Sequence, residues 1–71
     1  MSYYNINLTQ FSTSRLDTHD MRLYRRALQS YDWDDLYDIA DEAHSPDLRE
    51  IIRAKGRMLR HLDEYAAYGT V

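Results

Sequence analysis

Apolar side chains recur with the period of an α-helix through most of this chain, and that periodicity restricts the fold more than any other feature. The first periodic segment begins near Asp17 or Thr18, which both suit a helix N-cap, and it runs to about Ser30. Asp32 suits the N-cap of a second segment, which ends before His44. Almost no residues separate the two segments, so a tight corner or a kink is predicted between them.

A third and longer helix is predicted from Pro46 to about Ala67. Ser45 suits its N-cap, and proline is common at the first helical position because its missing N–H would have no partner there. Gly69 suits the C-terminal end. Gly56 interrupts the helix pattern, and a glycine inside a helix indicates a close crossing with a neighbouring helix.

The segment before the first helix has a different character. Residues 1–14 are rich in β-prone side chains, and Ile6 and Leu8 alternate with polar neighbours. Such a segment either packs on the helices as an arm or pairs as a strand with another chain. The predicted fold class is therefore all-α: a small bundle of two to three amphipathic helices in one domain over 15–71, with an extended or β-prone N-terminal arm over 1–14.

The three helices differ in the charge of their polar faces. The first and third present arginines, and the candidates for phosphate contact on them are Arg22, Arg26, Arg49, Arg53, Arg57 and Arg60. The second presents acids, namely Asp34, Asp35, Asp38, Asp41 and Glu42. These acids would face the phosphates if the second and third helices docked on DNA as a helix-turn-helix, so nucleic-acid binding is the weaker of two hypotheses.

Size and composition favour a chain that associates with another chain. With 71 residues the core is small, and the absence of cysteine removes disulfides as a stabilising device. We therefore expect a homodimer or docking on a partner. The net charge of −3 gives no overall attraction to nucleic acid or anionic lipid. No signal peptide or membrane span is visible, and a cytoplasmic location without membrane contact is expected.

No motif for catalysis, a cofactor or a metal stands out. An EF-hand loop starting at Asp32 would need glycine at its sixth position and glutamate at its twelfth, where Tyr37 and Ala43 stand. The three histidines include no i, i+4 pair, so structural roles are expected for them. Two glycines cannot build a phosphate-binding loop. We expect no enzyme activity, no cofactor, no metal site and no small-molecule substrate.

Lys55 and the aromatic residues indicate an interface. Lys55 falls inside the apolar arc of the third helix, where it either extends to the edge of the arc or meets an acid of another chain. This arc is wider than one helix contact requires. Among the seven tyrosines and the single tryptophan, the ones assigned to the core are Tyr24, Tyr31, Trp33 and Tyr37. Tyrosines near the chain ends suit an interface instead.

The leading hypothesis is therefore a small protein-binding regulator or inhibitor that docks directly on a larger protein. Its candidate binding residues are Asp34, Asp35, Asp38, Asp41, Glu42, Lys55, Tyr65 and Tyr68. Short helical chains without cysteine occur among phage and mobile-element inhibitors of host enzymes or defence complexes. This association rests on chain length and composition, and no shared motif supports it. The alternative is a DNA- or RNA-associated accessory protein that uses the basic faces of the first and third helices.

Overall fold

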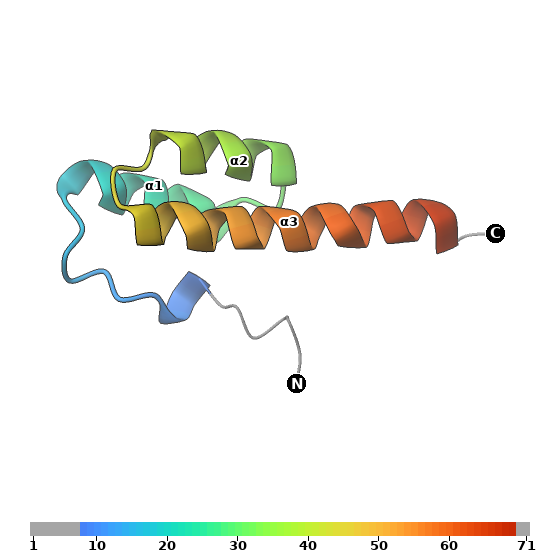
Figure 1. The fold of residues 1–71 in the computed structure, drawn as a ribbon, viewed down its shortest axis with the longest axis horizontal. Helices are drawn as coiled ribbons and strands as arrows, with labels where there is room; N and C mark the ends of the chain where they lie inside the picture. Colours follow the sequence, from blue (N-terminus) through green and yellow to red (C-terminus); the bar gives the residue numbers. More distant parts are fainter. Residues whose placement is uncertain (1–7, 70–71) are drawn as a thin grey trace.

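The chain folds into three α-helices preceded by a short 3-10 turn (Figure 1). The computed structural model describes residues 8–69, and it describes side chains as far as residue 65. The elements are η2 (Leu8–Gln10), α1 (Thr18–Gln29), α2 (Trp33–Glu42) and α3 (Pro46–Gly69). Within residues 8–69 there is no strand, which confirms the all-α class. The question of a strand in the arm falls on residues 1–7, which lie outside the described residues.

Each helix starts at the residue that the sequence indicates. Asp17 accepts the backbone N–H of Asp20 at 2.8 Å, and Asp32 accepts the N–H of Asp34 at 3.1 Å. The Ser45 hydroxyl accepts the N–H of Leu48 at 3.3 Å. Each of these oxygens satisfies one of the N–H groups that the first turn of a helix leaves without an internal partner.

The core lies where α1 and α2 cover the first half of α3. Its fully buried side chains come mainly from α2 and α3, namely Leu36, Ile39, Leu48 and Ile52. The end of the arm joins this core, because Leu8 is buried and its carbonyl accepts a hydrogen bond from the Tyr24 hydroxyl at 2.8 Å. Phe11 lies beside the Tyr24 ring, with 6.1 Å between the ring centroids.

Gly56 marks the close approach of α2 and α3, as its position inside the third helix predicts. It is buried, and a Cβ added there would lie 3.0 Å from Cε1 of Tyr37 and 3.5 Å from Cβ of Leu36. A larger side chain at this position would require the Tyr37 ring to shift. Glycine is about 1 kcal/mol less favourable than alanine inside a helix. At this position that cost is offset by the close packing of α2 against α3 that glycine allows.

The second half of α3 projects beyond the other two helices (Figure 1). Every side chain from Arg60 to Tyr65 is exposed. The wide apolar arc predicted for this helix is thus covered in its first half, by Leu48 and Ile52 in the core, and uncovered farther along. None of the helices in the described part of the chain combines the length and the apolar character that crossing a membrane requires.

The assignment of Tyr31 to the core is wrong. Its side chain is 78% exposed, whereas Tyr24 is buried and both Trp33 and Tyr37 are half-buried. The reason is local: α1 ends at Gln29, and the next residue, Ser30, has an extended backbone with φ −85° and ψ 134°. Tyr31 therefore leaves the helical phase that would have placed it on the apolar face.

Candidate protein-docking surface

An open groove lies between the α1–α2 corner and the projecting half of α3. Its volume is about 550 Å³, and its lining residues are Tyr31, Asp32, Trp33, Leu59, Leu62 and Asp63. Leu62 is 43% exposed, and Tyr65, one turn farther along α3, is 70% exposed. Together with Tyr31, these are the large hydrophobic side chains that the described part of the chain leaves exposed. We call this set of residues, with Tyr65, the corner groove.

Lys55 contacts Tyr31, one of the residues that line the corner groove. Its ammonium group donates hydrogen bonds to the carbonyl oxygens of Ala27 at 2.7 Å and Leu28 at 3.3 Å. It also lies 4.7 Å from the centroid of the Tyr31 ring, a cation–π contact. Partial burial lowers the pKa of Lys55 from its usual value. The ammonium group thus donates to the last carbonyl oxygens of α1, where a cation also suits the helix dipole. The position of Lys55 in the apolar arc therefore does not require an acid from another chain.

Trp33, two residues after Tyr31, also lines the corner groove. The guanidinium of Arg60 lies 5.0 Å from the centroid of the Trp33 ring, and Tyr37 meets the same ring edge-on at 5.9 Å. Arg60 also donates a hydrogen bond to the Glu64 carboxylate at 3.2 Å. Its pairing with Glu64, helped by the Tyr37 hydroxyl, raises the pKa of Arg60. Trp33 therefore contacts both a cation and an aromatic ring of its own chain.

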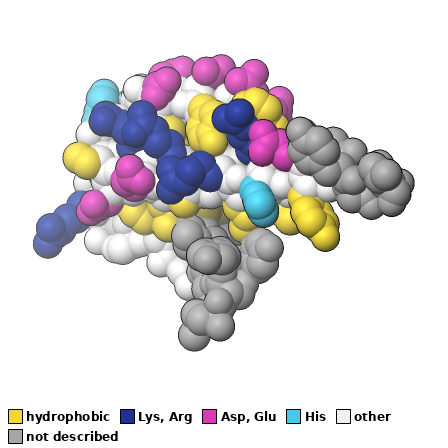
Figure 2. Space-filling model, turned by 45° about the vertical axis from the view of Figure 1, so that its right-hand side comes forward, with side chains coloured by type: hydrophobic (Ala, Val, Ile, Leu, Met, Phe, Trp, Pro, Cys, Tyr) yellow, Lys and Arg dark blue, Asp and Glu magenta, His cyan; other side chains and the backbone are white. Residues whose placement is uncertain are grey.

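The acidic face of α2 continues from the corner groove along the molecule. Figure 2 shows acidic side chains in a row at the upper edge, over α2. Asp41 pairs with Arg53 at 3.1 Å, and Asp35 lies 3.9 Å from Arg26. Within residues 8–65, the side chains of the other predicted acids make no ion pair; they are Asp34, Asp38 and Glu42.

The remaining aromatic candidates lie on the projecting half of α3. Tyr65 is among the most exposed large hydrophobic side chains of the described chain, and its interface role stays a prediction. Tyr68 belongs to α3, but its side chain lies outside the described residues.

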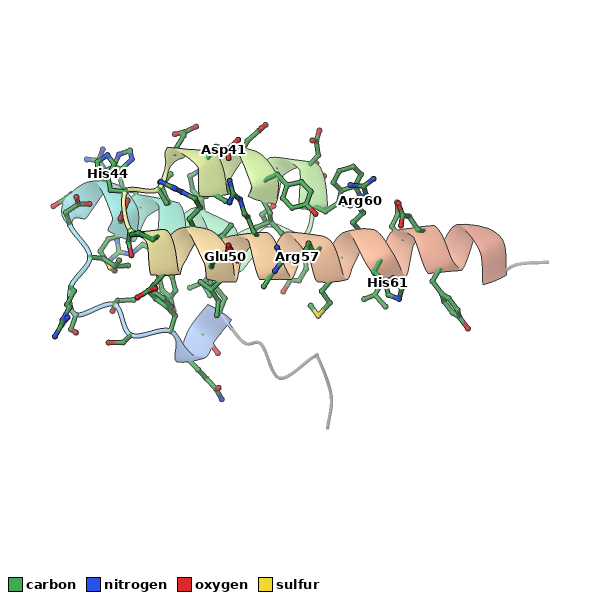
Figure 3. The ribbon with its side chains drawn as sticks, in the orientation of Figure 1. Asp41, His44, Glu50, Arg57, Arg60 and His61 are labelled. Atoms are coloured by element: carbon green, nitrogen blue, oxygen red, sulfur yellow. The ribbon has the colours of Figure 1, made fainter. Side chains whose placement is uncertain are left out.

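The arginines proposed for phosphate contact are mostly engaged within the chain. Arg49 donates to the carbonyl oxygen of Ala43 at 2.8 Å, which turns its guanidinium toward the end of α2. Four others have carboxylate neighbours, the pairs being Arg26–Asp35, Arg53–Asp41, Arg57–Glu50 and Arg60–Glu64. Figure 3 shows Arg57 and Glu50 on the same side of α3. Arg22 is exposed and has no ion pair among the described residues.

A cluster that the sequence analysis did not identify lies where α1 begins and α2 ends. The rings of His19 and His44 stack with 4.3 Å between centroids, and the Asp20 carboxylate lies beside them. Asp20 is only 2% exposed. The sequence carries a signal for this burial, because Asp20 shares the helical face of Leu23 and Ala27. The pairing of His19 with His44 has no such signal.

The chain thus has two groups of residues suited to contact with other molecules. The corner groove joins exposed aromatic and aliphatic side chains to acids at its edge. The histidine cluster joins two imidazoles to a buried carboxylate at the start of α1. The chain matches no protein-family model, no curated protein and no solved structure.

Proposed function

We propose that this chain is a small protein-binding regulator that inhibits a larger protein by covering part of its surface. The observation that carries this function is the corner groove. Tyr31 and Tyr65 are 78% and 70% exposed on a chain of 71 residues, beside the exposed side chain of Leu62. Aromatic and aliphatic side chains grouped on an exposed surface mark protein-binding sites, and tyrosine is frequent among the residues that dominate binding energy.

The partner segment that fits this surface is basic and amphipathic. Its apolar side would contact Tyr31, Leu59 and Leu62, and its basic side would meet Asp32 and Asp63, which line the same groove. A basic, nucleic-acid-binding surface of a larger protein has this chemistry. In that case the acids of this chain imitate phosphates, and the regulator inhibits by competing with nucleic acid.

The acids of α2 extend the same complementarity. Asp34, Asp38 and Glu42 stand four residues apart in sequence, so they form like-charge i, i+4 pairs on the helix surface. Each such pair destabilises a helix by about 0.2–0.5 kcal/mol. Asp41 and Glu42 also lie in the last turn, where acids oppose the helix dipole. A basic partner would offset both unfavourable terms.

The nucleic-acid alternative has less support. It needs arginines that are available to phosphates, and those of α3 already contact acids or carbonyl groups of the chain. The acids of α2 would also repel phosphates near this surface. A mobility-shift assay at low salt decides the matter, because phosphate contacts are strongest there. Retardation of DNA or RNA that is lost in Arg22→Gln together with Arg26→Gln would favour the alternative over protein docking.

The decisive experiment compares partner capture by matched variants of the full chain. Wild type and variants are used to capture proteins from the native host, and the captured protein is purified and titrated against each variant by calorimetry. We expect Tyr31→Ser with Tyr65→Ser, and separately Asp34→Lys with Asp38→Lys, to weaken binding at least tenfold. Asp47→Lys, an exposed acid of α3 outside the corner groove, is the control and should bind like wild type.

Two outcomes would overturn the proposal. One is a captured partner whose affinity is the same for the double tyrosine variant and for wild type. The other is a purified chain that forms a dimer by light scattering and becomes a monomer in the double tyrosine variant. The second result would assign the corner groove to a second copy of this chain. Circular dichroism of each variant checks that the helices are retained.

A further inference from the structure

The histidine cluster brings together side chains that are distant in sequence. His19 lies in the first turn of α1, and His44 lies in the turn between α2 and α3. Their rings stack with an interplanar angle of 21°. One ring nitrogen from each histidine and one carboxylate oxygen of Asp20 all lie within 4.8 Å of one another.

The hydrogen bonds of both rings leave one nitrogen of each free to bind a metal ion. Nε2 of His19 lies 2.8 Å from the carbonyl oxygen of Glu42, which can only accept, so this nitrogen carries the proton and Nδ1 keeps its lone pair. Nδ1 of His44 lies 3.2 Å from Oδ2 of Asp17 and donates to it, which leaves the lone pair on Nε2. Histidines that ligate metals nearly always donate their other N–H to a carbonyl or a carboxylate in this way.

Asp20 contributes a buried carboxylate to this cluster. Its carboxylate is buried, and its two oxygens accept the backbone N–H groups of His44 and Ser45, each at 2.9 Å. Within residues 8–65 no lysine, arginine or histidine side chain forms an ion pair with it. Buried carboxylates are usually paired with a cation or coordinate a metal. Each oxygen retains a second lone pair after its hydrogen bond.

We propose that His19, Asp20 and His44 bind a divalent transition metal ion such as Zn²⁺. Two imidazoles and one carboxylate suit zinc, cobalt or nickel, whereas magnesium and calcium prefer oxygen ligands throughout. Ligand atoms around tetrahedral zinc stand roughly 3–3.5 Å apart. The exposed histidine rings would therefore have to close by up to about 1.5 Å through rotation of their side chains.

A metal ion here would join the start of α1 to the turn that precedes α3. Three protein ligands leave one tetrahedral position for water or for an acidic group. In Figure 3, His44 lies at the end of the molecule opposite the projecting half of α3, where His61 stands. The metal site and the corner groove are therefore separate surfaces and can be tested separately.

The test measures metal binding to the full chain after removal of any affinity tag. Zn²⁺ is titrated by calorimetry, and Co²⁺ by its visible absorption, which reports tetrahedral ligation. We expect one ion per chain, no binding of Mg²⁺, and at least a tenfold loss of affinity in His19→Gln and in His44→Gln. His61→Gln is the matched control, because His61 is exposed and lies outside the cluster. It should bind like wild type.

Two further variants test the geometry. Asp17→Asn keeps a good N-cap but removes the carboxylate that orients His44, and we expect it to weaken Zn²⁺ binding about tenfold. Zn²⁺ affinity should also fall in acidic buffer, since protonated imidazole cannot bind a metal. Absence of Zn²⁺ binding in wild type, equal binding in the His19 and His44 variants, or loss of binding in His61→Gln would each overturn the proposal.

Discussion

Oδ2 of Asp20 accepts a hydrogen bond from the backbone N–H of Ser45 at 2.9 Å, so a side chain of α1 holds the start of α3. Oδ1 of the same carboxylate accepts the N–H of His44 at the same distance. These donors stand at and just before the N-cap of α3, where N–H groups lack helical partners and a negative charge suits the dipole. The Asp20 carboxylate therefore joins the start of α1 to the start of α3 through hydrogen bonds.

Replacing Asp20 should cause the largest loss of stability among the polar residues. In Asp20→Ala, two partly buried N–H groups lose their acceptor, and each loss is expected to destabilise the fold by about 1–3 kcal/mol. Urea unfolding in the presence of a chelator measures the loss without a contribution from bound metal. Asp47→Ala, an exposed acid in the first turn of α3, is the control and should lose no more than about 1 kcal/mol. A loss for Asp20→Ala as small as that of the control would contradict this role.

Lys55 should stabilise the end of α1 through its ammonium group rather than through its stem. Lys55→Met keeps the apolar stem but removes the donor to the carbonyl oxygens of Ala27 and Leu28. We expect a loss of about 1.5–3 kcal/mol in urea unfolding, the usual contribution of a hydrogen bond to a charged group. Arg57→Met, which breaks only an exposed 3.9 Å pair with Glu50, should lose less than about 1 kcal/mol. Equal losses in the two variants would rule out the capping role.

The effect of alanine at Gly56 should depend on Tyr37. In wild type, the added Cβ lies 3.0 Å from the Tyr37 ring, so Gly56→Ala is expected to destabilise the fold. In a Tyr37→Ala background that ring is absent, and the same change should stabilise it by about 1 kcal/mol through helix propensity. A double-mutant cycle by thermal or urea unfolding measures the coupling between the two positions. If the cycle shows no coupling, the two helices are farther apart than the structure places them.

Asp17 should titrate below the usual range for aspartate. The backbone N–H of Asp20, followed by the side chain of His44, lowers the pKa of Asp17 from 3.8. A carboxyl with a lowered folded-state pKa stabilises the fold above its unfolded pKa, and this stabilisation is lost as pH falls through the folded value. The loss should therefore occur below about pH 4.

The same carboxyl offers a site-specific check by NMR. In His44→Gln the pKa of Asp17 should rise, but it should remain below its ordinary value because the hydrogen bond from Asp20 persists. Carboxyl chemical shifts recorded between pH 2 and 6 follow both variants. An unchanged pKa in His44→Gln would show that the His44 contact does not form in solution.

Much of the helical structure follows from local sequence. Asp17, Asp32 and Ser45 mark the helix starts because an N-cap involves only a side chain and the next few backbone N–H groups. The exposed acids of α2 are likewise visible from periodicity, since the face of a helix follows from residue spacing alone. The close approach at Gly56 is also visible in the sequence, because a glycine inside a helix indicates close packing even when the neighbouring helix is not identified.

Contacts between residues distant in sequence needed the tertiary structure. The stacking of His19 on His44 and the bonds from Lys55 to the end of α1 depend on how the helices meet, which no local pattern records. The exposure of Tyr31 has the same origin, because it depends on the single residue at which α1 ends. The positions of the helices and the charge of their faces thus follow from residue order, since those features depend on neighbours a few residues away. Packing between the helices sets which charges are satisfied within the chain and which apolar side chains stay uncovered, because both depend on residues that are distant in sequence.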